Sequence, residues 1–328
     1  MQYFNPFENL HFNENSCFLS GADLDKEDSK VNIFPEWVIE QFGYKGKKFT
    51  LMDTFHAYPY EDFKLPSSPD VKAAFEKLDK EVQAAFEKGY EGIKLLDEKK
   101  LFLWMGKIVY GILYHELTIE KEKMERRENK LKLSPVLKKR FSLFHLMLQS
   151  LNAPITFGEK KPWSISIVKL KYSKDIFHYR DSAINLLSSL GVNGVGIIVC
   201  FQDNGIITAE HADILNKIND TVLHPVQFEE LCARFLYSDY IMKHIPLSEI
   251  KSSEKGLLIQ AESIPKDSGE VFFDRWEDEM FAQLLANYWE VWGLTMQDIY
   301  KPPNSPISFL ENPKDYSFIV PEQIKLPF

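Results

Sequence analysis

The second half of the chain contains acidic and imidazole side chains whose types suit proton transfer or metal binding. Histidines and carboxylates that meet in one site can act as general base and general acid, or can bind a metal ion. The candidate residues are Asp203, His211, His224 and Glu230, with Asp213 and Glu229 in the same stretch. The region 203–230 is therefore a candidate for acid–base or metal chemistry.

Each of these residues also has a structural interpretation. Asp203 belongs to the stretch 202–205, Gln-Asp-Asn-Gly, which is typical of a turn. His211 and Asp213 fall in a predicted first helical turn, where the helix dipole favours an acid. His224 precedes a proline that is well suited to open a helix. The alternative to a functional site is that these side chains only shape the local backbone.

Three other stretches begin like catalytic or nucleotide-binding motifs but lack a required feature. His115 and Glu116 start like the helix of a zinc protease, yet Ile119 stands where the second histidine is required. The stretch 43–48 has glycines and lysines without the spacing or the Ser/Thr of a P-loop. The stretch 191–196 leads into an apolar strand, whereas a dinucleotide fingerprint follows one. We predict a helix, a basic turn and a strand start at these places.

The cysteines are Cys17, Cys200 and Cys232. Their odd number and the absence of a CxxC pair argue against both a disulfide framework and a paired-cysteine zinc site. Neither Cys200 nor Cys232 lies in a sequence typical of a catalytic nucleophile. We expect reduced, buried thiols, no bound metal and no cofactor.

The composition is that of a globular protein. The 328 residues are 45% hydrophobic and 14% aromatic, enough for a sizeable core. A net charge of −9 argues against broad phosphate binding, although a local basic face can persist in an acidic protein. No signal-peptide pattern and no apolar run of membrane-spanning length occur in the sequence. We expect a soluble cytoplasmic protein without a membrane partner.

The first half is predicted to be mostly helical. A short strand over Val31–Phe34 precedes a helix opened by Pro35. Apolar residues then recur at steps of three and four over Asp70–Leu96, which predicts an amphipathic helix. The stretch Lys99–Leu117 is apolar on nearly every side, which predicts a central, enclosed helix. Another helix is predicted over Ser134–Leu151, with the serine as its cap.

The second half mixes strands with helices. Strands are predicted from alternation or from β-branched residues, and helices from caps and period. The predicted strands are Trp163–Tyr172, Val192–Phe201 and Gly256–Glu262, and the predicted helices begin at Thr208, at Pro225 and at a capping Asp274. The turn at 202–205 is expected to join two strands as a hairpin. We place a domain boundary near residue 155, giving domains 1–155 and 156–328.

The first third of the chain contains several short pieces in a fixed order. They are Cys17–Gly21, Val31–Trp37, Leu65–Ser68 and Trp104–Gly111. In order and spacing they resemble bacterial HNH-type endonuclease-like proteins. In that family a CxxC knuckle precedes Glu-His-Val-Phe-Pro-x-Trp, and a second cysteine pair follows Val-Pro. The resemblance implies a treble-clef-like ββα element that holds zinc beside a nuclease site.

The positions that bind zinc in that family are altered here. Cys17 matches the first knuckle cysteine, but Ser20 stands at the second. By the same alignment, the later pair falls at Ser68 and Val71. Structural zinc needs four thiolate or imidazole ligands, which these residues cannot supply. The resemblance therefore implies a frame that has lost its metal support.

The catalytic positions are altered as well. Asn32 stands where the family has the histidine that acts as general base, and Val31 stands where it has an acid. An amide does not titrate near neutral pH, so Asn32 cannot take a proton from water. We do not expect hydrolysis by the HNH route.

These observations predict an α+β protein with a degenerate HNH/treble-clef-like N-terminal element and long helices. A small, mainly antiparallel sheet flanked by helices follows. We expect a catalytically inactive scaffold with a binding or regulatory role, and nucleic acid or a protein as its partner. Two alternatives stay open: a nuclease or hydrolase that uses the 203–230 region, and an oligomeric module whose apolar helices form the interface.

Overall fold

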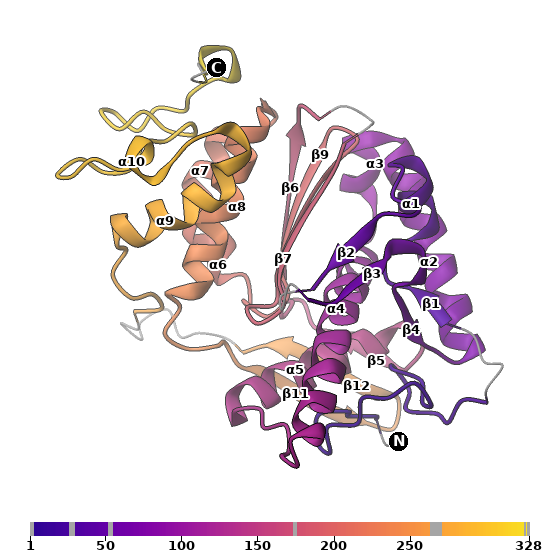
Figure 1. Cartoon of the computed structure of the whole chain (residues 1–328). Coiled ribbons are helices and arrows are strands. Elements are labelled where there is room, and N and C mark those ends of the chain that lie inside the picture. Colours follow the sequence, from indigo (N-terminus) through magenta and orange to yellow (C-terminus); the bar gives the residue numbers. More distant parts are fainter. Residues whose placement is uncertain are drawn as a thin grey trace.

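The computed structural model describes residues 3–25, 30–51, 55–172, 176–262, 271–324 and 326. Helices alternate with mostly short strands, and most strand pairs are antiparallel. The predicted α+β class is therefore confirmed (Figure 1).

A five-stranded mixed sheet lies between two groups of helices (Figure 1). Its strands, in spatial order, are β10 (Val222–Leu223), β6 (Ser164–Leu170), β9 (Val195–Cys200), β8 (Leu187–Val192) and β7 (Phe177–Ser182). The pair β10–β6 is parallel and the other pairs are antiparallel. Since β7 pairs on one side only, it is an edge strand with partly exposed side chains.

The hairpin turn of this sheet differs from the predicted one. Asn193 and Gly194 have φ angles of 49° and 77°, as a two-residue turn with positive φ at both central positions requires. They split the predicted strand Val192–Phe201 and join β8 to β9. The stretch 202–205 leads into a short helix and not into a second strand.

The helical stretch after that turn is also divided. Instead of one helix from Thr208, α6 spans Ile206–Glu210 and α7 spans Ala212–Ile218. Thr208 is no cap, because it lies inside α6, whose N-cap residue is Gly205; its hydroxyl donates to Ser164 Oγ at 2.8 Å.

The two faces of the sheet enter different hydrophobic clusters. On β9, Val195, Ile197 and Val199 face the first-half helices, whereas Ile198 and Cys200 face the second-half helices. Both faces are buried along β8 and β9. A strand covered on both sides reads as a continuous apolar run, and this explains the sequence VGIIVC.

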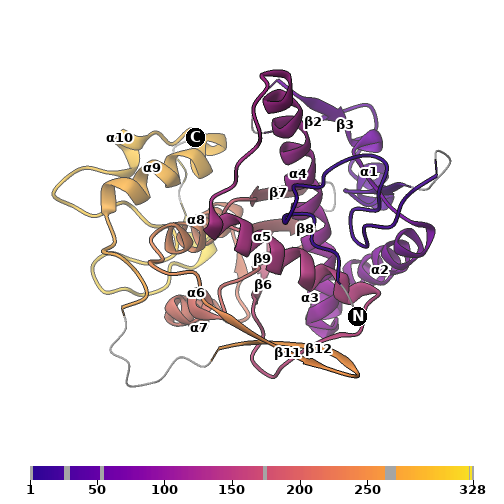
Figure 2. The same ribbon diagram turned by 90° about the horizontal axis from the view of Figure 1, so that it is seen from below.

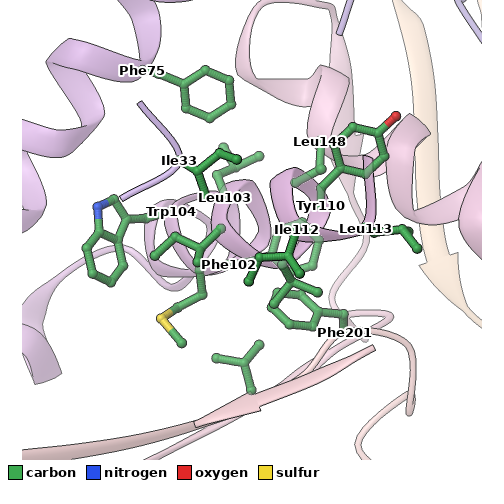
Figure 3. Close-up of a cluster of buried hydrophobic side chains, with 14 of the residues drawn as sticks. Ile33, Phe75, Phe102, Leu103, Trp104, Tyr110, Ile112, Leu113, Leu148 and Phe201 are labelled. Carbon is green, nitrogen blue, oxygen red and sulfur yellow. The ribbon is translucent and has the colours of Figure 1, made fainter. Parts of the chain in front are cut away.

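The first half supplies long helices to one face. They are α2 (Pro69–Glu87), α3 (Gly89–Leu95), α4 (Glu98–Arg126) and α5 (Pro135–Leu148). Helix α4 is buried on all sides from Leu101 to His115, as its apolar sequence predicts (Figure 3). Its Gly111 allows close approach, since a Cβ there would lie 2.6 Å from Ile33.

Small elements surround these helices. They are β1 (Lys30–Asn32), α1 (Glu36–Gln41), β2 (Lys48–Thr50), β3 (Ala57–Pro59), β4 (Lys64–Pro66), β5 (Ile155–Phe157), β11 (Ser248–Ser253) and β12 (Gly256–Ala261). Strands β1 and β4 pair antiparallel and lead directly to α2. Phe102 contacts Phe201 with ring centroids 5.6 Å apart, so residues 1–155 and 156–328 share a hydrophobic core.

The remaining helices cover the other face. They are α8 (Pro225–Tyr240), α9 (Asp278–Trp289) and α10 (Met296–Ile299). Helix α9 begins after Glu277, later than the predicted cap Asp274, because the Asp274 N–H donates to the Ile241 carbonyl in an extended segment. Seen from below, α1 and α2 lie on the opposite side of the molecule from α9 and α10 (Figure 2). Within the described ranges, no helix has the length and apolarity needed to cross a bilayer.

Candidate functional site

Residues 15–24 form a tight turn that holds Cys17. The Cys17 N–H donates to the Ala22 carbonyl, and the Gly21 N–H donates to the Cys17 carbonyl, both at 2.8 Å. Gly21 has a φ of 71°, and a Cβ there would lie 2.4 Å from the Phe4 ring. Only glycine combines this backbone angle with this lack of space.

The turn packs against the start of α2. The Phe18 N–H donates to the Pro66 carbonyl at the end of β4, which brings Ser68, the N-cap residue of α2, to Cys17. The Ser68 hydroxyl donates to the Asp70 carboxylate, and its oxygen lies 3.6 Å from Cys17 Sγ. Burial alone would raise the pKa of the Cys17 thiol, but hydrogen bonds from Ser20 and Ser68 outweigh it, and the pKa is lowered. The structure thus brings Cys17, Ser20 and Ser68 together.

The surroundings of this cluster are apolar. Val71 is 1% exposed and Cys17 is fully buried. The Phe18 ring stacks on Phe75 at 5.9 Å. No group of three or more His, Cys, Asp or Glu residues that could hold a metal ion occurs in the part of the chain that the structure describes. The region is a filled core whose polar atoms bond to one another.

Asn32 lies in strand β1, opposite Lys64 of β4. The nearby histidine comes from another element: His115 Nε2 of α4 lies 2.8 Å from the Lys64 carbonyl oxygen. Burial lowers the pKa of His115, so its ring is held neutral as a donor to the backbone. At this position β1 therefore carries an amide, and the nearby histidine bonds to the backbone.

Asp203 supports the backbone near a polar cleft. It is 1% exposed, and its Oδ2 accepts from the Ser164 hydroxyl at 2.7 Å and from the Ile207 N–H at 3.2 Å. Burial raises its pKa to about 6. Ser164 lines a cleft of about 470 Å³ together with Lys161. Asp203 therefore meets a serine and a helix start, and none of the other candidate residues bonds to it.

The other three candidate residues have separate partners. His211 Nε2 lies 2.9 Å from Ser238 Oγ, and burial lowers its pKa to about 4. His224 Nδ1 accepts from the Val226 N–H and caps α8.

Glu230 instead holds the C-terminal segment. Its carboxylate pairs with Arg234 and accepts from the N–H groups of Phe309 and Leu310. The four residues do not form one constellation.

A different histidine–carboxylate pair does form, between β7 and α8. His178 Nδ1 lies 2.9 Å from Glu229 Oε1, and the Glu229 side chain is 2% exposed. Arg180 Nε lies 3.2 Å from Glu229 Oε2, an ion pair without a hydrogen bond. The Arg180 guanidinium also lies over the Tyr288 ring, 4.6 Å from its centroid. The Tyr172 hydroxyl is 3.2 Å from His178 Nδ1.

This geometry fixes the histidine tautomer. A carboxylate at Nδ1 places the ring proton there and leaves Nε2 as the basic nitrogen. His178 is 23% exposed, so water can reach part of the ring. The arrangement suits a general base that a buried acid orients.

Sequence reasoning included Glu229 in the 203–230 region but missed its partner His178, because the two residues are far apart in the chain. One signal was available: His178 and Arg180 are two residues apart in FHYRDS, so they share one face of a strand. The Glu229–Glu230 pair gave no sign that its two members point to opposite partners.

No family model, curated protein or solved structure matches this chain.

Proposed function

We propose that the protein is a binding or regulatory protein whose N-terminal element is an HNH-like frame without metal and without phosphodiesterase activity. The observation that carries the proposal is the meeting of Cys17, Ser20 and Ser68, residues up to 51 positions apart. They are the positions that the resemblance assigns to zinc ligands. In the proposed frame, contacts between the serine hydroxyls and the Cys17 thiol take the place of zinc–thiolate bonds.

The strand pairing around the cluster gives further support. Strands β1 and β4 pair antiparallel, although α1, β2 and β3 lie between them in the chain; α2 follows β4, and the turn at Cys17 bonds to the end of β4. Asn32 and the buried, neutral His115 leave this strand pair without a general base.

Placing cysteines at the proposed zinc-ligand positions tests whether the N-terminal element has the geometry of an HNH-like zinc site. We expect the variant Ser20→Cys/Ser68→Cys/Val71→Cys, with the native Cys17, to bind Co²⁺ at one equivalent and to develop the visible absorption of tetrahedral thiolate coordination. The matched control is Ser16→Cys/Ser67→Cys/Asp70→Cys, which places three cysteines beside the same positions. A triple variant that stays folded by circular dichroism, yet absorbs no more than the control, would refute the frame.

The partner in this proposal is a nucleic acid or a protein. Lys45, Lys47 and Lys48 are exposed in the turn before β2 and at its start, whereas Lys72 pairs with Glu76. Gel retardation of DNA at increasing salt tests the nucleic-acid arm, since phosphate contacts weaken steeply with salt. We expect Lys45→Glu/Lys47→Glu/Lys48→Glu to remove the retardation. If no salt-sensitive retardation occurs, nucleic acid is excluded as the partner, and the proposal is left with a protein partner.

The His178–Glu229 pair favours a second candidate function, hydrolysis by general-base catalysis. In this mechanism His178 Nε2 takes a proton from water as the water oxygen attacks an ester centre, and the protonated ring returns the proton to the leaving alcohol. Arg180 pairs with the same carboxylate as His178 and would contact the developing negative charge.

Activated ester probes test this second function. If it is correct, p-nitrophenyl acetate or bis(p-nitrophenyl) phosphate is hydrolysed, and His178→Gln lowers the rate about 10²–10⁴-fold. The control His244→Gln alters an exposed histidine and leaves the rate unchanged. Equal rates in the two variants would exclude it.

A further inference from the structure

An apolar groove runs between the later turns of α4 and the start of α5. Its volume is about 410 Å³, within the range of small-molecule pockets. Its walls include Leu113 and Leu117 of α4, Leu137 and Phe141 of α5, and Leu51 and Ile184. Apart from the half-exposed Ile184 and the partly buried Leu137, these side chains belong to the buried core, so the floor is continuous with it.

The charges on the lining are mainly acidic. Glu116, Glu120 and Lys123 follow one another along α4 at steps of four and three, so they lie on one helix face. Asp181 on β7 lies outside the lining but within the field of Glu116, since burial and the Glu116 charge raise the pKa of Asp181 to about 7. The lining itself holds two carboxylates, Glu116 and Glu120, against the single cation Lys123.

We propose that this groove binds a small amphipathic amine, with its apolar chain along the leucines and its ammonium group beside Glu116. An ammonium ion beside Glu116 meets a lining in which carboxylates outnumber cations, and this favours its charged form. A fatty acid would add a further negative charge beside Glu116 and Glu120. A neutral chain would gain only the apolar contact. The site uses none of the residues of the Cys17 frame, so the two proposals stand independently.

Three ligands with one chain length separate these contributions. n-Octylamine, 1-octanol and octanoate are titrated into the full-length protein by calorimetry, below the concentrations at which they aggregate, with thermal unfolding as a second readout. We expect octylamine to bind and to raise the Tm in proportion to its concentration. Octanol should bind more weakly, and octanoate should show no binding.

Variants locate the ligand. Glu116→Gln should weaken octylamine about fivefold and leave octanol unchanged. The control Glu125→Gln removes an exposed carboxylate from the same helix, outside the groove lining, and should change nothing. Ile184→Arg places a long cation at the groove rim and should abolish binding of both ligands, while its half-exposed site keeps folding intact.

The outcomes that overturn the proposal are distinct. Octanoate binding as tightly as octylamine would reject the cation preference. Octylamine affinity that is equal in wild type and Glu116→Gln would reject the ammonium site. No binding of any of the three ligands, or binding that survives Ile184→Arg, would reject the groove itself.

Discussion

The N-terminal frame and the β7–α8 contact both place polar side chains against the core, but with different chemistry. In the N-terminal frame, the buried Cys17 thiol lies against the Ser68 hydroxyl, which also donates to the Asp70 carboxylate at the start of α2. In the β7–α8 contact, the buried Glu229 carboxylate meets two partners, His178 and Arg180, from a distant strand. Hydroxyl and thiol groups therefore pack into the core of the first region, whereas ionic partners meet at a sheet edge in the second.

The largest expected effect concerns the ionic region. Glu229→Ala leaves His178 and Arg180 without their buried carboxylate, and we expect a loss of about 3 kcal/mol in the free energy of unfolding, since both partly exposed side chains can be rehydrated. Urea unfolding measures it. Glu279→Ala, at an exposed position, is the control and should change little. A similar small loss in both variants would mean that the ion pair contributes nothing to holding β7 on α8.

A second effect concerns the frame and depends on pH. His145 Nε2 donates to the Phe18 carbonyl at 2.8 Å, and Gln149 Nε2 donates to His145 Nδ1 at 3.1 Å. In the neutral ring, Nε2 donates and Nδ1 accepts. Protonation of Nδ1 would place its N–H group against the Gln149 N–H donor. Burial lowers the pKa of His145 to about 4, from an ordinary value of 6.5.

The lowered pKa of His145 determines how stability changes with pH. The unfolded chain binds this proton below pH 6.5, whereas the folded chain binds it only near pH 4, so stability falls as the pH falls through this window. We expect this titration to lower the free energy of unfolding at pH 4 by on the order of 3 kcal/mol relative to neutral pH. Unfolding of His145→Gln between pH 4 and pH 7 should show a shallower slope than wild type. An unchanged slope would mean that His145 does not titrate in this way.

The smallest effect tests the contact between Cys17 and Ser68. Ser68→Ala removes this contact and the hydrogen bond to Asp70, and we expect a loss of about 1 kcal/mol in the free energy of unfolding. A double-mutant cycle with Cys17→Ala should give a coupling energy of similar size or smaller. A coupling of several kcal/mol would instead point to an ionic or metal-supported contact, and the contrast between the two regions would disappear.

Much of the fold followed from local patterns. The apolar stretch around Trp104 predicted the enclosed helix α4, and the alternation after Trp163 predicted β6. The turn chemistry was harder, because both Asn193-Gly194 and the stretch 202–205 favour turns. Only the pairing of β8 with β9 shows which of them closes the hairpin.

The arrangement of the candidate site residues could not be predicted either, because it depends on contacts between distant parts of the chain. Asp203, His211, His224 and Glu230 were grouped because they are close in sequence. In the structure each faces a different element, since residues on a helix point around its axis and a turn redirects the chain. The His178–Glu229 pair depends on how β7 docks on α8, which no local pattern encodes. The prediction of an HNH-like frame rested on order and spacing, and it stays a prediction.

The metal content of the native chain tests directly whether hydrogen bonds or a zinc ion hold the residues around Cys17. The full-length protein is expressed in zinc-replete medium, freed of loosely bound ions, and its zinc-to-protein ratio is measured by elemental analysis beside Cys17→Ala. We predict a ratio near zero for both chains. Stoichiometric zinc in the wild type that is lost in Cys17→Ala would contradict a frame that is held by hydrogen bonds alone.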